Sequence, residues 1–242
     1  MIAWRQGKRV NRILFFITAL FIASCSPVKN QAPYPVAENP AAVTGEIASG
    51  YFSRPHRRPK IVIDAGHGGK DQGAKSPHVK DMIEKDLTLS TAKLLDRYLT
   101  QLGYETIMIR TGDVFIPLDA RAEFANANTP DLFVSVHYNS APNKSAHGIE
   151  VYYYKEENER SESGKALAKV VLDNVLSSTH AKSRGIKHGN FAVIRETRMP
   201  AILIEAGFLT NREESKLIED PYYRNRLARG LAQGIREYLK NH

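Results

Sequence analysis

Cysteine is almost absent from the sequence. A single cysteine, Cys25, occurs among 242 residues. No disulfide can therefore form within one chain, and a cysteine-rich zinc site is excluded as well. The informative property of Cys25 is its position near the amino terminus.

Long hydrophobic runs are also lacking. The apolar stretch 13–23 is shorter than the roughly 20 residues of a membrane span, and it follows the basic residues Arg5, Lys8, Arg9 and Arg12. This pattern is typical of a secretory signal. The motif "IASC" (22–25) resembles the lipobox of bacterial lipoproteins. That resemblance implies a signal peptide over 1–24 and a lipid on Cys25.

The resemblance to lipoproteins also implies a location. The protein is expected to be periplasmic and anchored in a membrane, and Ser26 after the cysteine favours the outer membrane. An uncleaved signal anchor is the alternative. In both cases the body of the protein is exported.

The positive charge of the chain is unevenly spread. The net charge is +8, and removal of the four basic residues of the signal segment lowers it to +4. A further basic group lies at 54–60. Because the remaining body is close to neutral, a nucleic-acid partner is not expected.

The region after Cys25 differs in composition from the rest of the chain. Residues 26–59 are rich in proline and small residues and have no amphipathic period, so 25–59 is interpreted as the lipidated cysteine and a flexible tether. Residues 60–242 are interpreted as one domain.

Apolar segments typical of strands and helices alternate through this domain. Strands are predicted over 60–64, 104–110, 131–139, 148–154 and 201–207. Helices are predicted over 84–102, 117–128, 163–178, 213–218 and 221–239. This alternation predicts an α/β fold, a three-layer α/β/α sandwich with a mostly parallel sheet. Ligands in such folds bind beyond the carboxyl ends of the strands.

The glycine-rich segment "IVIDAGHGGKDQGA" (61–74) first suggests a phosphate-binding loop. A Walker loop requires Ser or Thr after its Gly-Lys pair, but Asp71 stands there, and Asp64 replaces the first glycine. The dinucleotide pattern fails at Asp71 as well. Both phosphate-binding motifs are therefore excluded.

A metal site explains the same segment better. His67 and His137 each follow an apolar strand, and Glu84 begins a predicted helix. Two histidines and one carboxylate are a common catalytic zinc set. The alternatives are hydrogen-bonded histidines at strand ends, and an acidic residue favoured by the helix dipole. In the metal reading, the glycines permit a tight turn and leave room for substrate.

Glu205 ends another apolar strand. A buried glutamate is costly unless it is paired or functional. Near a metal-bound water it could serve as general base. The alternative is a buried salt bridge with Arg195 or Arg198.

Four motifs occur in order along the domain: "IDAGHGGKDQGA", "EKDLTLSTAKLL", "SVHYNS" and "IRETRMPAILIEAGFLTNREES". Together they resemble the zinc-dependent N-acetylmuramoyl-L-alanine amidases of bacterial cell-wall turnover, over about residues 60 to 240. The resemblance implies a six-stranded, phosphorylase/hydrolase-like sheet, zinc bound by His67, Glu84 and His137, and catalysis by Glu205. The bond cleaved would be the amide between N-acetylmuramic acid and L-alanine in peptidoglycan.

Three further residues are weaker candidates for the surroundings of the metal. Asp64 and Asn139 flank the ligands and could orient them, and Glu150 begins a strand near His137.

Regulation can be predicted from one short segment. Some members of the family carry an inserted helix that plugs the zinc site, but 154–164 is short and highly charged. We therefore expect an open site, for which an activator is possible but not required. The protein is also expected to be a monomer. Two other functions stay open, a peptidoglycan peptidase with the same zinc site and a lipoprotein that binds peptidoglycan without cleaving it.

Overall fold

The structure is a computed structural model that describes residues 57–242. The predicted signal peptide (1–24), Cys25 and nearly all of the predicted tether (25–59) lie outside the described residues. Within 57–242, no helix combines the length and the apolar character needed to cross a membrane.

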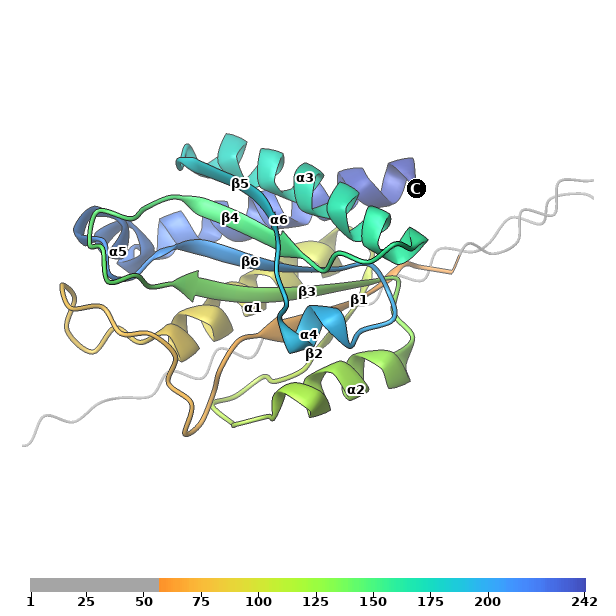
Figure 1. Cartoon of the computed structure of the whole chain (residues 1–242), viewed down its shortest axis with the longest axis horizontal. Coiled ribbons are helices and arrows are strands. Elements are labelled where there is room, and N and C mark those ends of the chain that lie inside the picture. Colours follow the sequence, from red (N-terminus) through yellow and green to blue (C-terminus); the bar gives the residue numbers. More distant parts are fainter. Residues whose placement is uncertain (1–56) are drawn as a thin grey trace, which may run out of the picture. The chain divides into compact units, whose positions relative to one another are not determined.

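Six strands form one mixed sheet in the order β2-β1-β3-β6-β4-β5 (Figure 1). The strands are β1 (Lys60–Ala65), β2 (Glu105–Met108), β3 (Leu132–Asn139), β4 (Ile149–Tyr153), β5 (Ser183–His188) and β6 (Ala201–Phe208). All neighbouring strands are parallel except β4 and β6, which run antiparallel. The predicted α/β fold with a mostly parallel sheet is confirmed.

Helices cover both faces of the sheet. They are α1 (Glu84–Gln101), α2 (Leu118–Asn128), α3 (Glu159–Thr179), α4 (Ala192–Arg195), α5 (Arg212–Glu219) and α6 (Pro221–Asn241). Figure 1 shows α2 and α4 in front of the sheet and α1, α3 and α6 behind it. Two apolar cores follow from this, one on each face.

Strand β1 shows how the two faces are built. Ile61 and Ile63 point into the core beneath α1, α3 and α6, whereas Val62 belongs to the core beneath α2 and α4. This alternation is the two-residue period of a strand. By the same period, Asp64 faces α2.

Two elements were not found from the sequence pattern, strand β5 and the single-turn helix α4. Strand β5 is at the edge of the sheet, and its sequence "SRGIKH" contains one large apolar residue. An edge strand needs little apolar surface, because only one side of it is paired and its faces are partly exposed. A four-residue helix shows no amphipathic period at all.

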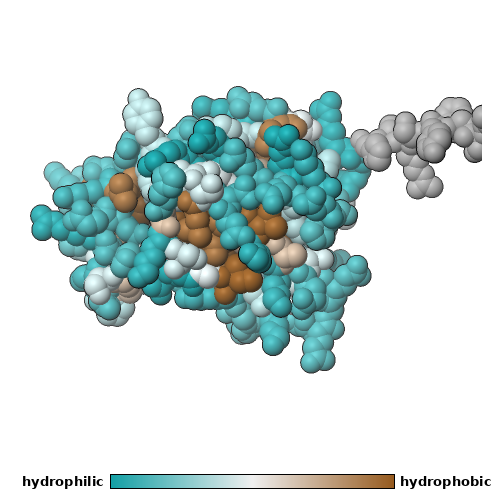
Figure 2. Space-filling view, turned by 90° about the horizontal axis from the view of Figure 1, so that it is seen from above, coloured by the Kyte–Doolittle hydropathy of each residue, from teal (hydrophilic) through white to brown (hydrophobic). Residues whose placement is uncertain are grey.

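Most of the surface is hydrophilic. The face shown in Figure 2 carries hydrophobic side chains near its middle, surrounded by hydrophilic ones. Exposed large hydrophobic residues of the described chain include Val114, Phe115, Leu118 and Phe191.

Helices α3 and α6 pack closely because two glycines of α6 face α3. A methyl group at Gly234 would lie 2.6 Å from the Cα atom of Val171, and one at Gly230 would lie 2.8 Å from the Cα atom of Val175. Both neighbours are backbone atoms, which cannot move aside without a shift of the helix.

We expect Gly234→Ala to lower the free energy of unfolding by about 1–3 kcal/mol, the usual cost of overpacking. The helix propensity of alanine alone would change it by about 1 kcal/mol in the opposite direction. Urea unfolding measures the difference. The control is Gly112→Ala, since a methyl group there meets nothing within 4 Å; a stabilised Gly234→Ala variant would contradict this account of the packing.

Candidate functional site

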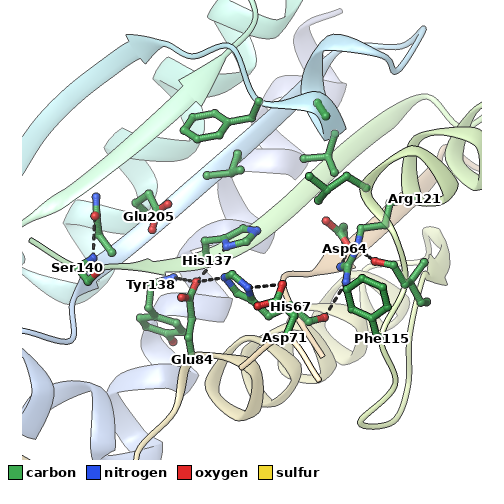
Figure 3. A pocket seen from close by; sticks show the side chains of 17 residues that line it. Asp64, His67, Asp71, Glu84, Phe115, Arg121, His137, Tyr138, Ser140 and Glu205 are labelled. Carbon is green, nitrogen blue, oxygen red and sulfur yellow. Dashed lines mark hydrogen bonds and ion pairs between the residues drawn. The ribbon is translucent and has the colours of Figure 1, made fainter. Parts of the chain in front are cut away.

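Three side chains from separate elements meet at one point (Figure 3). Oε1 of Glu84 lies 3.0 Å from Nε2 of His67 and 3.0 Å from Nδ1 of His137. One potential ligand atom from each residue lies within 4.8 Å of those from the other two. The structure thus brings together the three residues that the sequence suggested as metal ligands.

The topology explains how these residues converge. His67 comes two residues after β1, and His137 lies in the neighbouring parallel strand β3, in which Val136 pairs with Ala65. His67 adopts a left-handed backbone conformation, with φ of 61°. Its side chain is thereby turned back toward β3.

Glu84 reaches the histidines because the glycine-rich loop holds the start of helix α1. The backbone N–H of Glu84 donates to the carbonyl of Ala74 at 2.8 Å, and that of Lys85 donates to the carbonyl of Gln72 at 3.2 Å. These carbonyls satisfy two of the amide groups that a helix leaves unpaired at its first turn. The side-chain cap that usually does so is missing.

The carboxylate of Glu84 is buried and fully engaged. Its Oε2 accepts from the N–H of Ala74 at 2.8 Å, and its Oε1 accepts from the N–H of Tyr138 at 3.1 Å. Burial alone raises the pKa of Glu84, but the interactions with His137 and His67 outweigh it and hold the pKa well below its usual range. Glu84 is therefore ionised at neutral pH.

His67 has a second partner, Asp71. Nδ1 of His67 lies 2.9 Å from Oδ2 of Asp71, and Oδ1 of Asp71 accepts from the N–H of Gly73 at 3.1 Å. Burial alone lowers the pKa of His67, but Glu84 and Asp71 outweigh it and raise the pKa. From the sequence, Asp71 served only to exclude a nucleotide-binding loop, and its contact with His67 was not predicted. The position of Asp71 four residues after His67 was the one feature of the sequence that could have indicated this contact.

Two glycines make room for the cluster. A Cβ atom at Gly66 would lie 2.2 Å from the ring of His137. One at Gly73 would lie 2.6 Å from Oε2 of Glu84 and 2.7 Å from Cδ2 of His67. We expected the glycines to leave room for substrate, but at these two positions the space is filled by the clustered side chains.

This cluster fits a metal ion by its chemistry. Two imidazoles and one carboxylate are suitable donors for zinc and several other divalent ions. The three side chains occupy the space that Cβ atoms at Gly66 and Gly73 would need, and Asp71 holds the ring nitrogen of His67 that faces away from Glu84. A carboxylate that fixes a ligating histidine in this way is common at metal sites.

Two arginines that no sequence motif pointed to hold the backbone around His67. Arg121 donates to the carbonyls of Ala65 at 2.8 Å and His67 at 2.7 Å. Arg110 donates to the carbonyls of Ala65 and Gly66, each at 2.8 Å. Both arginines are 2% exposed. Three consecutive carbonyls are thus fixed by guanidinium groups.

Asp64 takes part in this network and forms no hydrogen bond or ion pair with the clustered histidines. Its Oδ1 pairs with Arg121 at 2.6 Å, and its Oδ2 accepts from the hydroxyl of Ser135 at 2.8 Å. Asp64 therefore acts on His67 through Arg121, by way of the carbonyl that Arg121 holds.

Asn139 and Glu150 interact with each other on the opposite side of the cluster. The side-chain amide of Asn139 donates to Oε1 of Glu150 at 2.8 Å. Glu150 is buried and pairs with Arg184 and Lys187. Within residues 57–242, the hydrogen bonds and ion pairs of Asn139 and Glu150 do not include His67, Glu84 or His137.

Glu205 stands beside the cluster without a partner of its own. In β6 it is in register with His137 of β3 and with Glu150 of β4. Its Oε2 is buried and has no hydrogen-bond partner among the described residues. Burial, followed by the charges of Glu84 and Glu150, raises the pKa of Glu205 well above its usual value.

The suggested alternative for Glu205, a buried salt bridge, is not found in the described part of the chain. Arg195 pairs with Glu196 at 2.8 Å and donates to Asn190. The backbone N–H of Arg198 donates to Asn126. Neither arginine forms an ion pair with Glu205.

A cavity of about 540 Å³ opens over the cluster. Its polar floor contains His67, Glu84, His137 and Glu205. Apolar residues, among them Phe115, Leu118 and Phe191, form one wall, and further polar residues complete the lining. None of the lining residues comes from 154–164, the segment that was predicted to be too short to carry a plugging helix. The cavity is thus a cleft with an apolar wall and a titratable floor.

Comparison with known proteins decides the family. Residues 61–237 match the family described as N-acetylmuramoyl-L-alanine amidase. The chain belongs to this family. The match covers all six strands except Lys60, the first residue of β1, and it includes His67, Glu84, His137 and Glu205.

Individual relatives agree with this assignment. The probable cell wall amidase LytH of Staphylococcus epidermidis is 32% identical over 189 residues, which cover 78% of this chain and 61% of LytH. An N-acetylmuramoyl-L-alanine amidase from Clostridium difficile has 39% identity and a TM-score of 0.72, with 76% of this chain and 97% of that one covered. The CwlD amidase from Clostridioides difficile, solved in complex with the GerS lipoprotein, has 27% identity and a TM-score of 0.72, with 76% and 100% covered.

We expect Arg121→Met to lower the free energy of unfolding by about 3–5 kcal/mol, because it leaves the buried carboxylate of Asp64 without its counter-charge. Chemical denaturation measures this loss. Arg229→Met is the matched control, since Arg229 is exposed on α6, and its effect should stay within about 0.5 kcal/mol. Equal effects of the two substitutions would refute the role given to Arg121.

Proposed function

We propose that this protein is a zinc-dependent N-acetylmuramoyl-L-alanine amidase that hydrolyses the amide between N-acetylmuramic acid and L-alanine in peptidoglycan. The observation that carries the proposal is the position of Glu205. Glu205 is half-buried and lines the same cavity as two histidines and a glutamate that suit a metal ion, and its buried Oε2 has no hydrogen-bond partner among the described residues. Membership of the amidase family supplies the substrate class.

His67, Glu84 and His137 would hold the zinc ion, through Nε2, Oε1 and Nδ1 respectively. When bound, zinc polarises the scissile carbonyl and lowers the pKa of water to about 7. Asp71 keeps the ring of His67 oriented, because it occupies the other ring nitrogen.

Glu205 would move the proton. Its carboxylate would accept a proton from the attacking water and then donate it to the departing nitrogen of L-alanine. The raised pKa of Glu205 favours the protonated form, but a cation held by the neighbouring ligands would lower that pKa again. Glu205 would therefore act as base only in the metal-loaded protein.

The apolar wall and the polar floor of the cleft would contact different parts of the substrate. Phe115, Leu118 and Phe191 would exclude water from part of the cleft and contact the less polar groups of the substrate. A drier cleft strengthens the electrostatic interactions at its floor.

The cellular setting is part of the same proposal. Cys25 would carry a lipid, and the protein would act in the periplasm as a monomer anchored in the outer membrane. The basic group near the domain would keep it close to its anionic polymer. The absence of 154–164 from the cavity lining supports a site that needs no activator to open it.

Digestion of purified peptidoglycan tests the proposed reaction. The zinc-loaded protein should release intact stem peptides and leave glycan that retains its lactyl groups, and a chelator should abolish the release. Mass spectrometry of the products measures both. Cleavage within the stem peptide would instead indicate a peptidase, and binding without any release would indicate a wall-binding protein.

We expect Glu205→Gln to lower kcat by about 10²–10⁴-fold, the usual contribution of a general base, while the bound zinc stays at one ion per chain. Glutamine keeps the shape of the side chain but accepts no proton from water. Steady-state kinetics and metal analysis measure the two quantities. Glu157→Gln changes an exposed residue of the charged segment and should have no effect; a Glu205→Gln variant with unchanged kcat would remove Glu205 from the reaction.

A further inference from the structure

A second polar cluster adjoins Glu205 and has no part in the proposed chemistry. It consists of Asn139, Glu150, Tyr152, Arg184 and Lys187, called here the Glu150 cluster. Its centre is the carboxylate of Glu150, which is 2% exposed. A buried carboxylate surrounded by so many donors is a built arrangement that needs an explanation.

The Glu150 cluster lies on the face of the sheet that forms the cleft. Glu150 is in register with Glu205, and Tyr152 is in register with Leu203, whose side chain lines the cavity together with that of Glu205. Tyr152 also pairs with Lys187 of the edge strand β5. Residues opposite one another in neighbouring strands point to the same face.

The Glu150 cluster is also continuous with the cavity. Asn139 lines the cavity and donates to Glu150 at 2.8 Å. The ring of Tyr152 packs edge-on against the ring of Phe191, another lining residue, with ring centroids 5.0 Å apart. The cluster therefore begins where the cavity ends.

The hydrogen-bonding capacity of Glu150 is used up. Its Oε1 accepts from Asn139 and from the hydroxyl of Tyr152 at 2.7 Å. Its Oε2 accepts from Nε of Arg184 at 2.7 Å and from Nζ of Lys187. A carboxylate offers about four acceptor positions. Glu150 can thus bind no further donor.

The two cations, in contrast, retain binding capacity. Among the described residues, Lys187 gives one of its three N–H groups to Glu150. Arg184 gives Glu150 only Nε, forms one further hydrogen bond, at 3.4 Å to the carbonyl of His147, and lies over the ring of Phe208. The side chains of Arg184 and Lys187 are 32% and 37% exposed. Within the Glu150 cluster, two positive charges face one negative charge, so one positive charge of the cluster is not neutralised by Glu150.

We propose that Arg184 and Lys187 form a subsite for a carboxylate of the stem peptide. The inference rests on the proposed function, in which the peptide departs from the scissile amide next to Glu205. Stem peptides carry free carboxylates, and both ammonium and guanidinium groups bind carboxylates through charge-assisted hydrogen bonds. Glu150 serves to hold the two cations in place, since they would otherwise repel each other.

The subsite also orients the substrate. The excess positive charge lies on the β4–β5 side of Glu205, whereas Phe115 and Leu118 line the wall near α2. The peptide would extend toward β5 and the sugar toward the α2 side.

Two soluble muropeptides that differ only in their peptide carboxylates test this subsite. In one the carboxylates are free, and in the other they are converted to primary amides. We expect the zinc-loaded protein to cleave the free form with kcat/KM about tenfold higher, a difference of about 1.4 kcal/mol. Most of that preference should lie in KM, because the subsite is remote from the reacting atoms.

Lys187→Met should reduce the preference to nearly one, and Arg184→Met should reduce it in part. Lys187→Arg keeps the charge and should retain the preference, which separates lost binding from lost folding. Lys169→Met is the matched control, since Lys169 is exposed on α3 and its one ion pair within residues 57–242 is with Asp173; it should leave the preference unchanged.

An unchanged preference in both Met variants would overturn the subsite, even if their overall activity fell. An unmodified protein without any preference would overturn it as well. If the unmodified protein released peptide from neither muropeptide, while the digestion of whole peptidoglycan also failed, the proposed function itself would be wrong, and the subsite with it.

Discussion

The structure of the site depends on one buried carboxylate. Glu84 contacts both histidines through a single oxygen atom and the glycine-rich loop through the other. The loop in turn holds the first turn of α1, from which Glu84 extends. Helix α1, the glycine-rich loop and strands β1 and β3 thus constrain one another around Glu84. Glycine is required at positions 66 and 73 because side chains of the cluster occupy the space that a Cβ atom would need there. A larger residue at either position would displace a ligand.

Three further carboxylates lie around Glu84, and they differ in how far neighbouring cations neutralise their charge. Asp64 and Arg121 neutralise each other and fix the backbone of His67. Glu150 is surrounded by cations that outnumber it. Glu205 forms no ion pair among the described residues, and the neighbouring carboxylates raise its pKa further. Such an isolated acid is unfavourable for stability, which is typical of a residue kept for chemistry. The cleft therefore combines three clustered side chains that suit a metal ion, a carboxylate without an ion-pair partner among the described residues, and two cations beside one carboxylate at one end.

Much of the fold followed from apolar periodicity, because five strands and five helices bury long stretches of side chains. Strand β5 and helix α4 escaped detection, since one is a half-exposed edge and the other is a single turn. The positions of His67, His137 and Glu205 at strand ends predicted their convergence. The support around them could not be predicted in the same way. Arg110, Arg121 and Asp71 act through backbone carbonyls or one ring nitrogen, and such contacts leave no periodic pattern. Asp64 acts on His67 only indirectly, because it pairs with Arg121, which donates to the carbonyl of His67.

The most direct test of the central claim is the location of bound metal in crystals of the zinc-loaded protein, measured by anomalous diffraction at the zinc absorption edge. The account predicts one strong peak per chain, coordinated by Nε2 of His67, Oε1 of Glu84 and Nδ1 of His137, with Glu205 close by but outside the coordination sphere. A peak elsewhere, a peak coordinated by Glu205 in place of Glu84, or no peak at saturating zinc would contradict it.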